Sequence, residues 1–169
     1  PRKNVPALIR AFDVLKQDPV HRDLQLVLAG PVGWLAHEVF KEAKRAMARG
    51  QIRFLGYLPA EDRVLLYNAA AVFAFPSYFE GFGFPPLEAQ ACGVPVIASE
   101  RTSLPEVLGA SAVMVNPWRV GDLASALQAY LTNSSARERA IRDGIKNAAR
   151  FTWEETAKKT IGVFSRIRT

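Results

Sequence analysis

The fold of this 169-residue chain can be inferred from the stretch Phe75–Ser99, FPSYFEGFGFPPLEAQACGVPVIAS. The first residues of this stretch end an apolar strand, and a loop with two glycines follows. Pro85 and Pro86 then predict the start of a helix, because proline suits the first turn, where a backbone N–H has no partner. The helix should stop at Gly93, and Val94 opens a second apolar strand. A strand, a glycine-containing loop, a helix and another strand in succession indicate an α/β fold.

The loop in this stretch has the chemistry of an anion site. Gly81 and Gly83 allow positive φ and let a ligand approach bare backbone closely. Free N–H groups and the dipole at the start of the following helix favour an anion. Glu80 precedes the glycines and Glu88 lies in the first turns of the helix, with seven residues between them. We therefore predict that the loop binds a phosphate and that a carboxylate at each end binds sugar hydroxyls.

Outside this stretch, apolar runs continue to alternate with helical periodicity. We predict strands over 24–30, 51–56, 71–75, 94–98 and 112–116, and helices over 4–17, 34–49, 60–70, 120–131, 135–149 and 153–167. This alternation predicts one parallel sheet flanked by helices, with right-handed crossovers. Ligands of such sheets bind beyond the carboxyl ends of the strands, where the loop 77–88 should lie.

Capping residues support several of these helix boundaries. Asn4 is a suitable N-cap for the first helix, and Thr102 or Ser103 for a short helix that ends at Gly109. The last helix is preceded by a capping-box pattern that begins at Thr152 and closes three residues later with a glutamate. These residues predict where the chain changes direction.

The segment EGFGFPPLE (residues 80–88), followed by AQACGVPVIA (89–98), resembles the E-x7-E motif of retaining nucleotide-sugar glycosyltransferases. That family has the GT-B fold and includes sucrose synthases and many bacterial mannosyl- and glucosyltransferases. Related motifs occur in order along essentially the whole chain: PRKN (1–4), LVLAG (26–30), FLGY (54–57), LPEV (104–107) and FTW (151–153). The resemblance implies that residues 1–169 form a single, Rossmann-like nucleotide-sugar-binding domain, the C-terminal half of such an enzyme. It also implies that the first strand and the N-terminal acceptor domain are absent from this chain.

The resemblance assigns roles to individual residues. Lys3 matches the family's lysine that binds the donor diphosphate, whereas the matching arginine would lie before Pro1. Glu80 matches the first glutamate, beside the transferred sugar, and Glu88 matches the second, which binds the ribose hydroxyls. Lys3 and Glu80 are thus the implied catalytic residues. The other implied substrate-binding residues are Gly81, Phe82, Gly83 and Phe84 through backbone donors, Tyr57 and Leu58 beside the base, and Ser103 and Leu104 near the phosphate or ribose.

Each assignment has a purely structural alternative. Arg2 and Lys3 could form a solvated end of the chain, and Tyr57 could be an ordinary rim aromatic. Glu80 could hold backbone N–H groups of its loop. Glu88 could be a first-turn glutamate stabilised by the helix dipole, an effect worth about 0.3–1 kcal/mol.

Composition limits the remaining classes of function. The chain is 49% hydrophobic and 22% charged, as in soluble globular proteins, and no apolar run reaches the length of a membrane span. The net charge of +6 is spread over helices without interleaved aromatics, which disfavours nucleic acid as a partner. A single cysteine, Cys92, fits a reducing cytoplasm and is expected to be a buried filler. Since many members of the resembled family act on lipid or polysaccharide acceptors, a peripheral membrane contact is a further expectation.

No metal or cofactor is expected. His21 and His37 lack carboxylate or cysteine partners at ligand spacing, and there is no D-x-D pair. We predict instead that Lys3, the missing arginine and the helix N-terminus stabilise a diphosphate leaving group.

The resulting prediction is the donor-binding domain of a retaining hexosyltransferase of the mannose or glucose type. Its donor would be an NDP-sugar and its acceptor a glycan or a lipid-linked sugar, with front-face attack rather than a covalent intermediate. This piece alone is expected to bind nucleotide weakly and to lack transferase activity. The alternative is a non-catalytic nucleotide-binding module of the same fold. The presence of Lys3, Glu80 and Glu88 argues against that alternative, because a degenerate site should have lost some of them.

Overall fold

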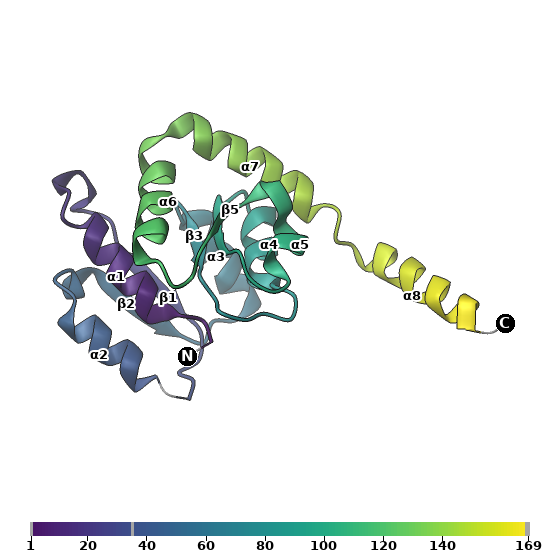
Figure 1. Ribbon diagram of the computed structural model, residues 1–169, viewed down its shortest axis with the longest axis horizontal. Coiled ribbons are helices and arrows are strands. Elements are labelled where there is room, and N and C mark those ends of the chain that lie inside the picture. The colour runs from purple at the N-terminus through teal and green to yellow at the C-terminus, as the bar shows by residue number, and fades with distance from the viewer. Residues whose placement is uncertain (1, 35, 168–169) are drawn as a thin grey trace.

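A computed structural model describes residues 2–34 and 36–167 of the chain (Figure 1). The first part consists of α1 (Val5–Leu15), β1 (Leu26–Ala29), α2 (His37–Arg45) and β2 (Ile52–Gly56), with short 3₁₀ turns at Pro19–His21 and Arg49–Gln51. The two strands are parallel. Helix α1 forms where the sequence has apolar residues at helical spacing, and these bury one face of the helix: Leu8, Ile9, Phe12 and Leu15.

The second part contains the stretch Phe75–Ser99, from which the fold was predicted. It consists of α3 (Ala60–Ala69), β3 (Phe73–Phe75), α4 (Phe84–Ala91), β4 (Val96–Ser99), α5 (Leu104–Leu108), a 3₁₀ turn at Gly109–Ser111 and β5 (Val113–Val115). The strands are parallel in the order β3-β4-β5. Every residue of β4 is buried, as expected of a central strand covered on both faces.

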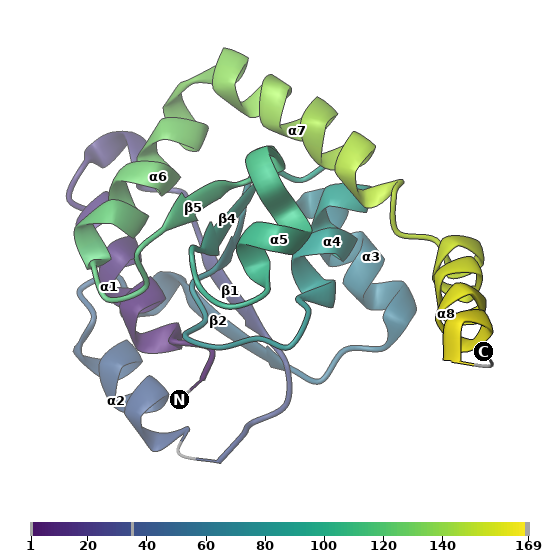
Figure 2. The same cartoon turned by 45° about the vertical axis from the view of Figure 1, so that its right-hand side comes forward.

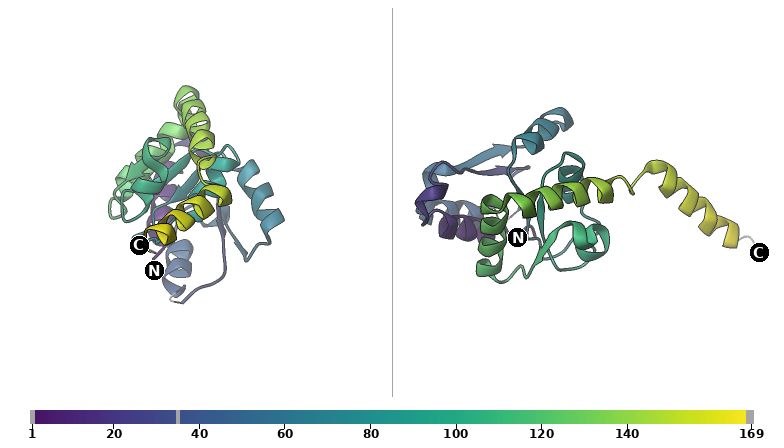
Figure 3. Two further views of the ribbon diagram at one scale, coloured as in Figure 1. Left: turned by 90° about the vertical axis from the view of Figure 1, so that its right-hand side faces the viewer. Right: turned by 90° about the horizontal axis from the view of Figure 1, so that it is seen from above.

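Three helices complete the chain: α6 (Val120–Thr132), α7 (Ser134–Ala148) and α8 (Trp153–Ile167). Helix α6 packs on α1 and helix α7 packs on α4 (Figure 2). Helix α8 projects away from the body, which two views at right angles show (Figure 1, and Figure 3, right), and it contains no buried residue.

A buried polar network fixes α4 against α7. The Nδ2 atom of Asn147 donates to Gln90 Oε1 at 2.9 Å and to the carbonyl of Val107 at 3.1 Å. The Nε2 atom of Gln90 donates in turn to the hydroxyl of Ser111 at 2.8 Å. Two residues after the end of α4, Gly93 has a φ of 72°, the left-handed conformation that commonly follows a helix C-terminus.

The predicted order of strands and helices is confirmed, but the predicted single sheet is wrong for the described residues. The strands form two sheets, β1-β2 and β3-β4-β5, and no backbone ladder joins β1 to β3. Side chains link the two sheets instead, since Leu26 and Leu28 of β1 and Ala74 of β3 pack on one hydrophobic cluster. Strand β1 alternates between half-buried and exposed residues.

Two of the predicted helix caps are also wrong, because tertiary contacts take the capping side chains. Asn4 has a φ of 52°, and its side-chain Nδ2 donates to the carbonyl of Pro117 at 2.6 Å rather than capping α1. Ser103 precedes α5, but neither it nor Thr102 caps that helix, because both side chains bind the loop at residues 80–82. The Thr152 cap is confirmed, since its hydroxyl accepts from the amide three residues later at 3.1 Å.

Candidate functional site

The carboxylate of Glu80 is the centre of a buried ion-pair cluster at the carboxyl end of β3. Lys3 Nζ lies 2.8 Å from Oε1 of Glu80, and Arg2 Nη1 lies 2.8 Å from Oε2. Only 7% of the Glu80 side chain is exposed, whereas the two cations are about half exposed. A buried carboxylate needs such partners. The two cations therefore compensate the charge of Glu80, while about half of each cationic side chain stays accessible.

Backbone and ring contacts hold the N-terminal segment in this position. The amide of Tyr78 donates to the carbonyl of Arg2 at 2.9 Å. The ammonium of Lys3 lies 4.3 Å from the centre of the Phe75 ring, within the range of a cation–π contact. With Asn4 held by Pro117, both cations are fixed on a segment that begins some 75 residues before Glu80.

The loop after Glu80 presents backbone amides. Among the described residues, no acceptor takes the amides of Gly81, Phe82, Gly83 and Phe84. The helix that follows adds less than the sequence suggested, because Pro85 and Pro86 in its first turn have no N–H group. Any anion at this edge would thus be bound by loop amides more than by the helix N-terminus.

The hydroxyls of Thr102 and Ser103, in the loop before α5, form hydrogen bonds that stabilise this conformation. Thr102 Oγ1 accepts from the amide of Glu80 at 3.0 Å. Ser103 Oγ lies 3.0 Å from the carbonyl of Glu80 and 3.1 Å from that of Phe82. Gly83 has a φ of 104°, whereas Gly81 does not use the positive φ that its glycine would allow. These internal hydrogen bonds therefore define the shape of the loop.

Glu88 lies in a second polar cluster, on α4. The hydroxyl of Tyr67 donates to its Oε2 at 3.0 Å, and Arg63 Nη2 lies 4.0 Å from its Oε1. Burial, followed by the charge of Glu88, raises the pKa of the Tyr67 phenol well above its ordinary value. The phenol is therefore a protonated donor at neutral pH. The Glu88 side chain is 38% exposed and can still reach a ligand.

The remaining predicted site residues differ in how far their side chains are exposed. Tyr57 is 75% exposed in the loop after β2, and Leu58 beside it is half-buried. The rings of Phe82 and Phe84 pack on each other at 4.8 Å, as expected of residues that also have a structural role. Leu104 is fully buried in the core, and its amide donates to the carbonyl of Arg101, so it does not fit the predicted ligand contact.

Sequence reasoning missed three contributors to these clusters. Arg2 was considered only as part of a chain end, although it pairs with Glu80 as closely as Lys3 does. Thr102 carried only the signal of a helix cap. Tyr67 stands in an apolar run of α3, 21 residues before Glu88, and no local pattern indicates that its hydroxyl reaches a carboxylate.

Cys92 fits the role of a structural residue. It is half-buried at the end of α4. Burial, followed by the charge of Glu88, raises the pKa of its thiol. A raised pKa keeps the thiol protonated, which is the opposite of what a cysteine nucleophile needs.

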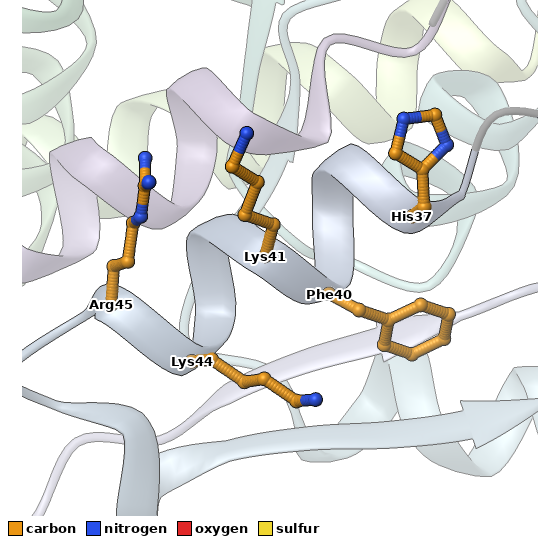
Figure 4. A pocket seen from close by; sticks show the side chains of 5 residues that line it. All are labelled: His37, Phe40, Lys41, Lys44 and Arg45. Carbon is orange, nitrogen blue, oxygen red and sulfur yellow. The ribbon is translucent and has the colours of Figure 1, made fainter.

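A hollow of about 610 Å³ lies elsewhere, on α2. Figure 4 shows that the side chains of His37, Lys41 and Arg45 rise on one side of this helix. Phe40 and Lys44 point to the other side, and the Phe40 ring packs at 5.0 Å from that of Phe54. Because all the residues that line this hollow come from α2, no second element brings a polar group to it, and it is not the candidate site.

Two features are absent from the described part of the chain. No three acidic, histidine or cysteine side chains lie together there as a metal site requires. No helix within residues 2–34 and 36–167 has the length and apolar content to cross a membrane.

Parallel strands flanked by helices, with polar clusters at the carboxyl end of β3 and on α4, define a Rossmann-like α/β domain of the GT-B kind. Residues 1–147 match the protein family described as glycosyl transferases group 1. The chain belongs to the group 1 glycosyl transferases.

Its relatives by sequence are transferases of greater length. The chain is 40% identical over 164 residues to the O-antigen chain mannosyltransferase B of Escherichia coli, and this match covers 97% of the chain and 43% of the relative. It is 37% identical over 169 residues to the serotype-specific mannosyltransferase WbdA of Escherichia coli, covering 99% of the chain and 21% of the relative. The chain thus spans less than half the length of these relatives.

Solved structures share the fold. The sucrose-phosphate synthase of Thermosynechococcus elongatus superposes with a TM-score of 0.84 at 26% identity, over 98% of this chain and 42% of that one. Anabaena Alr3699/HepE in complex with UDP-glucose superposes with a TM-score of 0.86 at 21% identity, over 98% of this chain and 46% of that one. At that identity the second likeness shows the fold alone.

Proposed function

We propose that this chain is the donor-binding part of a hexosyltransferase of the mannose or glucose type, and that it binds a nucleotide sugar across the Glu80 and Glu88 clusters. The observation that carries the proposal is the pairing of two half-exposed cations, Arg2 and Lys3, with the buried Glu80 beside a loop whose amides have no acceptor among the described residues. Fixed positive charge and free amides at one place suit a diphosphate.

The relatives support the choice of ligand. The two relatives from Escherichia coli are named mannosyltransferases, and solved structures of the same fold hold UDP or UDP-glucose. In our proposal Lys3 and Arg2 contact the diphosphate, Glu80 lies beside the hexose, and Glu88 accepts hydrogen bonds from the ribose hydroxyls. Tyr57 and Leu58 lie beside the base.

For the reaction we propose retention of the anomeric configuration by front-face attack. The bond between the sugar C1 and the diphosphate oxygen breaks, the acceptor hydroxyl oxygen bonds to C1, and its proton passes to the departing phosphate. Glu80 is a poor candidate for a covalent nucleophile, because cations hold both of its oxygens. Lys3, Arg2 and the loop amides would instead stabilise charge on the leaving diphosphate.

We propose that the acceptor site lies outside the segment described here, in a part that corresponds to the unmatched remainder of the longer relatives. A glycan or a lipid-linked sugar would be the acceptor, and a lipid-linked one would bring the enzyme to the cytoplasmic face of a membrane. Transfer would then need both parts, because positioning of the two substrates can account for roughly 7–11 kcal/mol of the barrier.

Calorimetry with UDP-glucose, GDP-mannose and ADP-glucose tests the proposal. We expect one of these donors to bind, and Lys3→Ala to weaken that binding about tenfold through the loss of a charged contact. Lys44→Ala is the matched control, since it removes the same charge from α2 and should leave the affinity unchanged. Absence of binding to all three donors, or equal loss in both variants, would contradict the proposal.

A further inference from the structure

Two side chains of α3, Tyr67 and Arg63, flank the Glu88 carboxylate. The Tyr67 hydroxyl donates to Oε2 at 3.0 Å, while the guanidinium of Arg63 approaches Oε1 only to 4.0 Å. Tyr67 therefore occupies one carboxylate oxygen with a hydrogen bond, and Arg63 leaves the other oxygen without one. A vicinal diol could still donate to Oε1 and to the second lone pair of Oε2.

The Tyr67 ring is itself held in place. It packs edge-on against Phe73 with the ring centres 5.5 Å apart and the planes at 76°. Phe73 stacks in turn on Phe75 at 5.9 Å, and Phe75 carries the ammonium of Lys3 on its face. A row of three aromatic rings thus runs from Lys3 to Glu88.

Such a row fixes the direction of the hydroxyl. Phe73 and Phe75 belong to β3, so the phenol is anchored to a strand of the sheet rather than only to its own exposed helix α3. A carboxylate whose rotamer is set by an anchored donor loses less conformational freedom when a ligand binds.

We propose that Tyr67, with Arg63 beside it, is a positioning residue that orients the Glu88 carboxylate for the 2′ and 3′ hydroxyls of the donor ribose. The inference rests on the proposed function, because it takes Glu88 as the ribose acceptor. It adds that recognition of ribose depends on a tyrosine that does not contact the nucleotide.

The experiment compares ribose with deoxyribose in the 169-residue chain. Calorimetric affinities are measured for UDP, GDP and ADP and for their 2′,3′-dideoxy forms, in the wild type and in Tyr67→Phe. This variant removes only the hydroxyl and keeps the ring on Phe73. Tyr130→Phe is the control, since it removes another phenol of the fold, which lies on α6.

We expect the wild type to bind the best of these ribonucleotides about tenfold more tightly than its dideoxy form, the worth of a charged hydrogen bond. Tyr67→Phe should reduce this ratio about fivefold through weaker binding of the ribonucleotide, with the affinity for the dideoxy form unchanged. Tyr130→Phe should keep the wild-type ratio. In a Glu88→Gln background, Tyr67→Phe should change the ratio no further, because the tyrosine acts through that carboxylate.

The possible failures are distinct. A Tyr67→Phe variant that binds nucleotide with an unchanged ratio overturns the positioning role and leaves the proposed function standing. Equal loss of affinity for both sugar forms would show that Tyr67 only braces α3, and it overturns the inference as well. Absence of any ribose preference in the wild type overturns the ribose role of Glu88 and the inference with it. Absence of nucleotide binding altogether overturns the proposed function.

Discussion

Position 83 favours glycine for two reasons, the backbone conformation and the lack of space for a Cβ atom. Its φ of 104° lies in the region where side chains are strained. A Cβ atom at this position would also lie 2.6 Å from Cδ2 of Leu104, a fully buried core residue that cannot move aside freely. Gly81, two residues earlier, has neither constraint, since its φ is not positive and its Cβ would meet open space.

Gly83→Ala should therefore destabilise the fold where Gly81→Ala does not. The strained backbone and the contact with Leu104 together should lower the free energy of unfolding by roughly 2–4 kcal/mol. Gly81→Ala should change it by less than about 0.5 kcal/mol. Urea unfolding followed by circular dichroism measures both. Equal stabilities of the two variants would show that the loop is not held against α5 as described.

At the scale of elements, α4 carries Glu88 and is fixed by polar groups rather than by apolar packing alone. The amide of Asn147 on α7 bridges the side chain of Gln90 and the carbonyl of Val107, and all three lie in a buried region. Gly144 of α7 allows the close approach, since a Cβ there would lie 3.1 Å from Cγ of Gln90. The position of Glu88 thus depends on α7.

Asn147→Ala should destabilise the protein by breaking this bridge. Two buried acceptors, the Gln90 side-chain oxygen and the Val107 carbonyl, would lose their donor, at a cost of about 1–3 kcal/mol. Asn68→Ala is the control, because Asn68 donates to a carbonyl on its own exposed helix and should matter little. Thermal unfolding of the two variants decides, and a smaller effect for Asn147 than for Asn68 would be incompatible with a buried network.

The elements themselves were predictable because each has a local signal. The double proline at the start of α4, the glycine at its end and the apolar runs of the strands gave boundaries within about three residues of those observed. The resemblance brought Lys3 and Glu80 to one site, and the ion pair confirms their contact. Their roles in binding stay predictions.

What could not be predicted depends on contacts distant in sequence. Thr102 and Ser103 have the local signal of helix caps, but their hydroxyls form hydrogen bonds with the backbone of residues 80–82 instead. Tyr67 is in a helical apolar pattern, and only the packing of α3 on α4 brings its hydroxyl to Glu88. The division into two sheets follows from pairing between strands, which no single strand encodes.

On the scale of the whole molecule, positive charge is available in two separate places. Lys3 and Arg2 are fixed at the carboxyl end of β3 by a buried counter-ion and a bonded backbone. On α2, Lys41 and Arg45 rise on one side of the helix and Lys44 points to the other (Figure 4), and the Glu38 carboxylate beside Lys41 is itself exposed. A diphosphate is bound best by charges that are fixed in place, so the account requires binding at the first place and not at the second.

Amide chemical shifts of the ¹⁵N-labelled chain, titrated with UDP, GDP and ADP in turn, test this central claim most directly. The account predicts that the largest shifts occur at the amides of Gly81, Phe82, Gly83 and Phe84, with a further shift at Lys3, while residues 37–45 of α2 stay unchanged. In Lys3→Ala the same shifts should require about tenfold more nucleotide. Shifts confined to α2, or no shift in the loop at millimolar nucleotide, would contradict the account.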